Sequence, residues 1–204
     1  MSIQQFLESI LGSAAGYATI VTKDQNSSPT IQRFFSYPDE LEEMSAYAEK
    51  FANEDVYFSP IVFHEKRRIR ENAKAVSVVY ADADTCAPEN FWLEPSISVE
   101  TSKDRWHCYW ILDSEQDPQR VANVAKKIAY AHRDRGCDVS GWNPTKLLRV
   151  AGTSNLKYDS RFTVTANSTG VIYSIDEIEK AYKDVVVESV PELALAPMPQ
   201  QTPE

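Results

Sequence analysis

Two carboxylates lie one residue apart at the end of an apolar, β-branched run. The run covers residues 76–81, and Asp82 and Asp84 follow it. In a β-strand, residues two apart share a face, so we expect both carboxylates to point the same way. Neighbouring carboxylates repel each other unless a cation joins them, and their hard oxygens suit Mg²⁺ or Mn²⁺, ions that also bind substrate phosphates. The pattern indicates a metal site, although an Asp-x-Asp after a strand is also typical of a turn or a helix cap.

A histidine further along the chain could bind phosphate. A strand over residues 105–112 would place Arg105, His107 and Tyr109 on one face and an apolar set on the other. A histidine flanked by aromatic residues is usually a core residue. The alternative is that His107 donates a hydrogen bond to a phosphate, with Lys103 and Arg105 close by.

Asp138 and Arg149 are two further candidates. Asp138 follows the end of a predicted helix, so its default interpretation is a turn residue. Arg149 interrupts the apolar sequence Leu-Leu-Arg-Val, and arginine is seldom buried without a partner. We therefore expect an anion beside Arg149, either a carboxylate or a phosphate, and Lys157 could join it.

Residues 64–74 form a basic segment in an acidic chain. The chain carries a net charge of -9, which opposes non-specific attraction to nucleic acid. A basic run is most often a solvated loop, but this one directly precedes the acidic strand. We therefore also consider a local contact with nucleic acid or phosphate, made by Arg67, Arg68, Arg70 and Lys74.

Length and composition favour an ordinary globular protein. With 204 residues, 43% hydrophobic and 25% charged, the chain can form one sizeable domain or two small ones. It contains neither an apolar run of roughly 20 residues nor a signal-peptide pattern, so we expect a cytoplasmic protein. The three cysteines form no Cys-x-x-Cys pair, and we expect neither a disulfide framework nor zinc.

Helices and strands are expected to mix along the chain, which predicts an α+β fold. Periodicity and capping patterns predict helices over residues 2–11, 38–51, 117–135 and 174–183. Strands are predicted over 17–22, 30–37, 56–63, 76–84, 96–101 and 105–112, with a second hairpin from 161–165 and 170–174. Residues 144–150 are ambiguous between a helical turn and a strand. Residues 185–204 contain four prolines and are predicted to be a linker or tail.

The order of these motifs resembles the primase-polymerases of the archaeo-eukaryotic primase superfamily, especially those of phage and plasmid replication. The resemblance runs from about Tyr57 to Lys157, and residues 148–155 (LRVAGTSN) are its most specific part. It implies that Asp82, Asp84 and Asp138 are catalytic and hold two divalent metals, Mg²⁺ or Mn²⁺. It also implies that His107 binds the nucleotide triphosphate and that Arg149 lies in the nucleotide site.

One position departs from that family. The family often has serine two residues before the histidine, where this chain has Arg105. How the phosphates are held is thus left open among Arg105, Lys103 and Ser102.

The resemblance implies a fold and an activity for residues 1–184. The fold would be a catalytic core with an RRM-like mixed or antiparallel sheet flanked by helices. The activity would be template-dependent synthesis and extension of primers on single-stranded DNA from NTPs and dNTPs, with a helicase domain following the tail. Tyr57 and Phe58 are candidates for stacking on the template, although an aromatic residue of a strand is more often part of the core. The alternatives are a metal-dependent nuclease and a non-catalytic nucleic-acid-binding module.

Overall fold

Two β-sheets and four α-helices make up the part of the chain that the computed structural model describes, residues 1–23, 30–74, 76–157 and 161–187. The helices are α1 (Ile3–Leu11), α2 (Leu41–Lys50), α3 (Pro118–Ala131) and α4 (Ile175–Ala181). The strands are β1 (Gly16–Lys23), β2 (Ile31–Tyr37), β3 (Asp55–Phe58), β4 (Val76–Asp84), β5 (Ile97–Ser102), β6 (Arg105–Gln116), β7 (Leu148–Arg149), β8 (Ser154–Asn155), β9 (Phe162–Thr163) and β10 (Thr165–Ser168). The fold is therefore α+β, as predicted.

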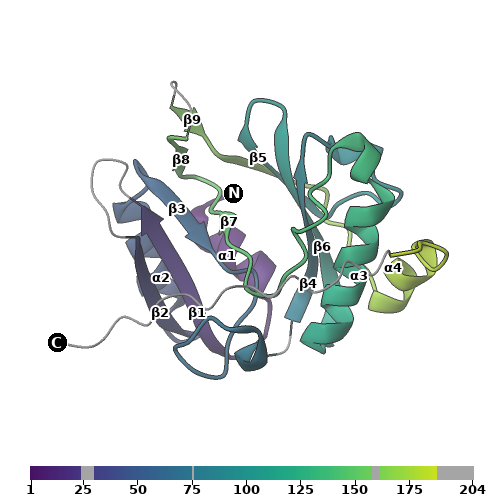
Figure 1. The fold of residues 1–204 in the computed structure, drawn as a ribbon. Coiled ribbons are helices and arrows are strands. Elements are labelled where there is room, and N and C mark those ends of the chain that lie inside the picture. The colour runs from purple at the N-terminus through teal and green to yellow at the C-terminus, as the bar shows by residue number, and fades with distance from the viewer. Residues whose placement is uncertain (24–29, 75, 158–160, 188–204) are drawn as a thin grey trace.

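The two sheets lie side by side, and the chain between α3 and β8 runs along the space between them (Figure 1). The first sheet has the order β2-β1-β3-β8-β9, with β7 also paired to β3. The second sheet is antiparallel, in the order β10-β5-β6-β4. Helix α2 packs against the first sheet, and α3 packs against β4 of the second. Strands from both sheets can therefore contribute to a site between them.

Helix α1 joins the two sheets. It begins with a capping box formed by Ser2 and Gln5, and it ends at Gly12, whose φ of 61° favours glycine. Its fully buried Phe6 makes edge-on ring contacts with Phe58 of the first sheet, at 5.4 Å, and with Tyr109 of the second, at 6.1 Å. The core between the sheets is thus held by an N-terminal helix far from the motifs in sequence.

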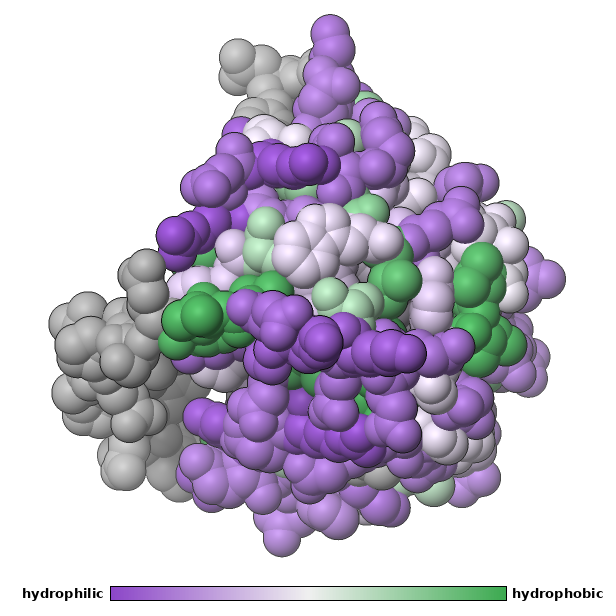
Figure 2. Space-filling model, turned by 90° about the vertical axis from the view of Figure 1, so that its right-hand side faces the viewer, coloured by the Kyte–Doolittle hydropathy of each residue, from purple (hydrophilic) through white to green (hydrophobic). Residues whose placement is uncertain are grey.

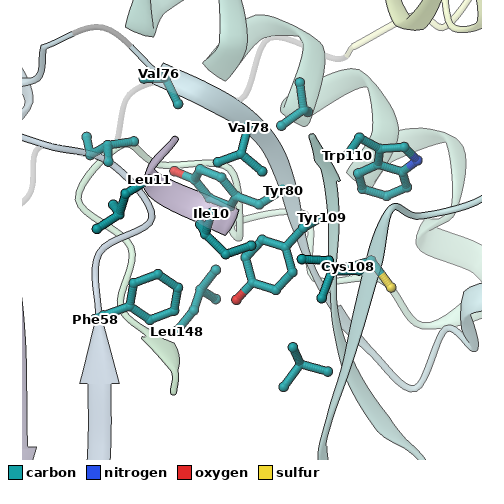
Figure 3. Close-up of a cluster of buried hydrophobic side chains, with 14 of the residues drawn as sticks. Ile10, Leu11, Phe58, Val76, Val78, Tyr80, Cys108, Tyr109, Trp110 and Leu148 are labelled. Carbon is teal, nitrogen blue, oxygen red and sulfur yellow. The ribbon is translucent and has the colours of Figure 1, made fainter. Parts of the chain in front are cut away.

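The pairing of β4 with β6 sets which side chains face that core. Tyr80 is opposite Tyr109, and both point toward α1 and β3 (Figure 3). Cys108 and Trp110 point the other way, toward α3, whose apolar side packs on the sheet. The face on the side of α3 and α4 carries many hydrophilic residues, with hydrophobic patches between them (Figure 2). The predicted alternation along residues 105–110 is therefore confirmed, because adjacent residues of a strand face opposite sides.

Most predicted elements are confirmed, including all four helices and the capping box of Ser174 with Glu177. The ambiguous segment 144–150 contains the two-residue strand β7. The predicted strand over 56–63 ends at Phe58, because Ser59 and Pro60 follow and proline cannot donate a ladder hydrogen bond. The turn over 24–29 and most of the tail lie outside the described residues.

The predicted hairpin over 161–174 is wrong. Strand β9 pairs with β8 in the first sheet, whereas β10 pairs with β5 in the second. Residues 170–174 contribute only a bridge from Tyr173 to Leu112. The chain crosses from one sheet to the other at Val164, and local periodicity does not reveal which sheet edge a short strand will join.

The three cysteines are buried and free, as expected of a chain without a disulfide framework. Among the described residues, no helix is both long and apolar enough to cross a membrane.

The contacts of Phe6 predict a large effect of its removal. Phe6→Ala should lower the free energy of unfolding by about 3–5 kcal/mol, because it leaves a cavity where α1 meets both sheets. Gln4→Ala, an exposed change on the same helix, should alter it by less than about 0.5 kcal/mol. Urea denaturation measures both; equal effects would contradict the role given to α1.

His132 predicts a dependence of stability on pH. It is buried beside Phe91 and Tyr182, and burial lowers its pKa to about 4. The unfolded chain therefore binds a proton between about pH 6.5 and pH 4 that the folded protein does not, so stability should fall as the pH falls through this range. His132→Gln should reduce this loss, whereas His64→Gln, at an exposed histidine, should not. An unchanged pH slope in His132→Gln would contradict the assignment.

Candidate functional site

A pocket of about 270 Å³ lies between the two sheets. Its walls come from strands of both sheets and from the chain before and after β7. The lining residues are Tyr57, Asp82, Asp84, Thr101, Ser102, Arg105, His107, Lys146, Leu147, Arg149, Asn155 and Lys157. Candidates spread over a hundred residues of sequence therefore meet in one place.

Asp82 lies at the centre of the charged groups. Its strand register places it opposite His107, whose Nε2 is 3.8 Å from Asp82 Oδ1. The other oxygen, Oδ2, is 2.8 Å from the Nζ of Lys146. The same Nζ is 3.1 Å from Asp138 Oδ2, so one ammonium bridges two carboxylates.

Asp138 is held by the loop that follows α3. Its backbone N–H donates to the carbonyl of Asp82 at 3.0 Å, and its Oδ1 accepts from the backbone N–H of Ser140 at 2.8 Å. Burial alone would raise the pKa of Asp138, but the hydrogen bonds from Ser140 and Lys146 outweigh it, and the pKa is lowered. Gly141 permits this approach, since a Cβ there would lie 2.7 Å from the Cβ of Asp82. Asp138 is therefore a fixed, charged member of the site rather than a simple turn residue.

Asp84 forms an ion pair with Arg105. The ladder shifts register between Asp82 and Asp84, and Asp84 has a positive φ of 47°. Both carboxylates nevertheless line the pocket, as the i, i+2 spacing predicts. Arg105 occupies the position that departs from the family pattern, and here its guanidinium neutralises a carboxylate.

His107 is neutral near pH 7. Burial lowers its pKa to about 4, although the nearby Asp82 carboxylate opposes the shift. Its Nδ1 has no hydrogen-bond partner among the described residues. A neutral imidazole still has one N–H to donate, so the residue retains hydrogen-bonding capacity for a ligand in the pocket.

Arg149 has the anionic partner that its sequence context predicts. Its Nη1 is 2.5 Å from Oδ1 of Asp55, and only 7% of its side chain is exposed. Its guanidinium also lies 4.7 Å from the ring centre of Tyr57. The partner is thus a carboxylate, and the salt bridge fixes Arg149 in the pocket wall.

Two charged residues at or beside the pocket, Asp55 and Lys146, have no role assigned from the sequence. Asp55 looked like the residue before a strand, and nothing local links it to Arg149. Lys146 lies three residues before Arg149, and its closeness to the most specific motif was the one available signal.

The other candidates are only partly brought together. Ser102 and Lys157 line the pocket, but Lys103 is exposed in the turn after β5. Tyr57 lines the pocket as well, whereas Phe58 is fully buried in the core, the more frequent position of a strand aromatic, and does not stack on a template.

The basic segment lies against the loop that carries Lys146. Arg68 donates to the carbonyl of Thr145 and, at 3.1 Å, to the side chain of Gln32. Arg67 and Arg70 are exposed, and Lys74 is half-buried. Arg68 therefore has a structural role, and Arg70 contacts the side chain of Gln119 at the start of α3.

The three carboxylates suit a divalent metal in their chemistry. Hard carboxylate oxygens are the donors that Mg²⁺ and Mn²⁺ prefer. Within the described ranges, however, no three histidine, cysteine or carboxylate side chains are already arranged around a metal position. Lys146 and Arg105 pair with these carboxylates instead.

Comparisons with known proteins identify the fold. No protein-family model matches the sequence, and no curated protein matches it. Among solved structures, the primase RepB' has a TM-score of 0.62 at 16% identity, over 89% of this chain and 62% of that one. The RepB' catalytic domain in complex with initiator DNA has a TM-score of 0.61 at 17% identity, over 90% and 95% of the two chains.

A third solved structure is the AEP domain of the cyanophage S-2L primase-polymerase. It has a TM-score of 0.59 at 14% identity, over 86% of this chain and 94% of that one. The chain spans less than two thirds of the longer RepB' structure but nearly all of each catalytic domain. The chain therefore has the fold of an archaeo-eukaryotic primase catalytic domain.

Proposed function

We propose that this chain is a template-dependent nucleotidyltransferase that makes and extends primers on single-stranded DNA in phage or plasmid replication. The observation that carries the proposal is the meeting of Asp82, Asp84 and Asp138 beside a pocket lined by His107 and Arg149. This combination occurs in a fold shared with a primase and a primase-polymerase.

Asp82, Asp84 and Asp138 would hold two divalent ions, Mg²⁺ or Mn²⁺. Such ions, when bound, lower the pKa of an attacking hydroxyl and stabilise the charge of a leaving pyrophosphate. The chain contributes the negative charge that holds the ions and the rigid loop that keeps Asp138 beside Asp82.

The remaining pocket residues would bind the nucleotide. His107 offers an imidazole N–H, and Ser102, which also lines the pocket, offers a hydroxyl. Arg149 offers guanidinium N–H groups in an orientation fixed by Asp55, so little conformational freedom is lost when a phosphate binds. Arg105 and the exposed Lys103 could approach the triphosphate from the β5–β6 turn.

Template binding would involve the basic segment. The RepB' catalytic domain has been solved with initiator DNA, and its fold is shared by this chain. Arg67 is exposed next to Arg68, which contacts the loop that leads to Lys146 and Arg149, and half-buried Tyr57 could stack on a base. A helicase beyond residue 204 stays a prediction.

The carboxylates predict the first test. Asp82→Asn or Asp84→Asn should slow extension of a primed DNA template at least about a hundredfold, because loss of even an outer-shell partner of a metal costs 10–100-fold. Asp39→Asn, an exposed change beside α2, should leave the rate unchanged. Incorporation of labelled nucleotides measures the rate.

Two outcomes of this test would contradict the proposal. One is an Asp82→Asn variant that keeps more than about a tenth of the wild-type rate. The other is loss of the labelled strand without any nucleoside triphosphate, which would indicate a nuclease.

The basic segment predicts the second test. Replacing both Arg67 and Arg70 by Gln should weaken binding to single-stranded DNA and reduce the slope of log affinity against log salt by roughly 1.4, about 0.7 for each lost phosphate contact. The matched control replaces the exposed Lys180 and Lys183 by Gln. Fluorescence anisotropy measures both slopes. Equal losses in the two double variants would mean that overall charge, rather than this segment, attracts the DNA.

A further inference from the structure

Lys146 lies where the proposed function needs a metal ion. Its Nζ is 2.8 Å from Asp82 and 3.1 Å from Asp138, and a quarter of its side chain is exposed. A lysine ammonium within hydrogen-bond distance of two carboxylates is in its charged form at neutral pH. The lysine therefore carries a positive charge between two of the three carboxylates assigned to the metals.

The backbone of Lys146 is anchored independently of its charged end. The hydroxyl of Tyr80 donates to the carbonyl of Asn143 at 2.8 Å, and the backbone N–H of Lys146 donates to the same carbonyl at 2.8 Å. Arg68 binds the preceding carbonyl, that of Thr145. The ammonium is separated from this anchor by four flexible methylene groups. It can leave the carboxylates by side-chain rotation alone, while the loop stays in place.

Asp84 shows the same arrangement with a different cation. Its carboxylate pairs with Arg105, so each of the three acidic side chains already has a basic partner. Two basic side chains thus offset three carboxylates and leave one net negative charge, and a divalent ion has to compete for its ligands.

We propose, on the basis of the function proposed above, that Lys146 is an internal cation that holds Asp82 and Asp138 together and competes with divalent metal for them. Lys146 is thereby a positioning residue that sets how tightly the site binds metal. Its ammonium keeps two mutually repelling carboxylates close, and a metal ion takes over that role when it binds.

The competition between Lys146 and a metal ion predicts in which direction the metal affinity changes when the lysine is replaced. A metal ion must displace the ammonium from two charge-assisted hydrogen bonds and then bind close to a remaining positive charge. Repulsion between charges about 4 Å apart is by itself enough to weaken binding about tenfold or more near a protein surface. Removing the charge of Lys146 should therefore tighten metal binding. It should also destabilise the metal-free protein, because Asp82 and Asp138 are then left unbalanced.

The test measures binding of Mn²⁺ alone, through the electron paramagnetic resonance signal of the free ion. Lys146→Met should bind Mn²⁺ at least about tenfold more tightly than the wild type. Lys146→Arg keeps the charge and should stay within about threefold of the wild type. Lys180→Met removes one exposed lysine from α4 and should leave the affinity unchanged.

Thermal unfolding gives a second readout that does not depend on synthesis. In EDTA, Lys146→Met should melt at a lower temperature than the wild type, and Mn²⁺ should raise its melting temperature more than that of the wild type. Lys146→Gln, also uncharged but able to hydrogen-bond, replaces the Met variant if that variant does not fold.

Two results would overturn the inference. In the first, the uncharged variants bind Mn²⁺ no more tightly than the wild type does. In the second, Mn²⁺ raises the melting temperature of the variants and of the wild type by the same amount. Failure of the proposed function would look different. In that case the uncharged variants would still bind Mn²⁺ more tightly, but the wild-type protein would synthesise no DNA or RNA.

Discussion

Repulsion among three neighbouring carboxylates is the constraint on which the rest of the site depends. Asp82, Asp84 and Asp138 come from two segments more than fifty residues apart, and each needs a positive partner to stay where it is. Lys146 and Arg105 supply those partners within the chain. A divalent ion can do the same with stronger charge, which is why an acidic site of this kind suits metal-dependent chemistry on phosphates.

The two-sheet architecture makes this concentration of charge possible. The carboxylates lie on and beside the second sheet, while Arg149 and Tyr57 project from the first. Helix α1 holds the sheets together through Phe6, and the buried pair of Arg149 and Asp55 fixes the opposite wall of the pocket. The stability of the apolar core and the geometry of the charged site are therefore linked.

Local sequence patterns predicted the features that depend on the backbone geometry of a single helix or strand. The alternation around His107 and the capping of α1 follow from backbone geometry, and the structure confirms them. Asp82 and Asp84 both line the pocket as predicted, although the ladder shifts register between them. The partners of Arg149 and Lys146 depend on contacts between distant segments. Contacts between distant segments also decide that β9 joins the first sheet and β10 the second. The periodicity within a segment does not specify which sheet that segment joins.

Synthesis on a primer-free, single-stranded DNA template tests the central claim most directly. The wild-type chain would be given labelled ribo- or deoxynucleoside triphosphates with Mg²⁺ or Mn²⁺, and products would be resolved by length. The account predicts products of two nucleotides and longer that require the metal and disappear in EDTA. No product from this template, together with no extension of a supplied primer, would contradict it and favour a nucleic-acid-binding module without catalytic activity.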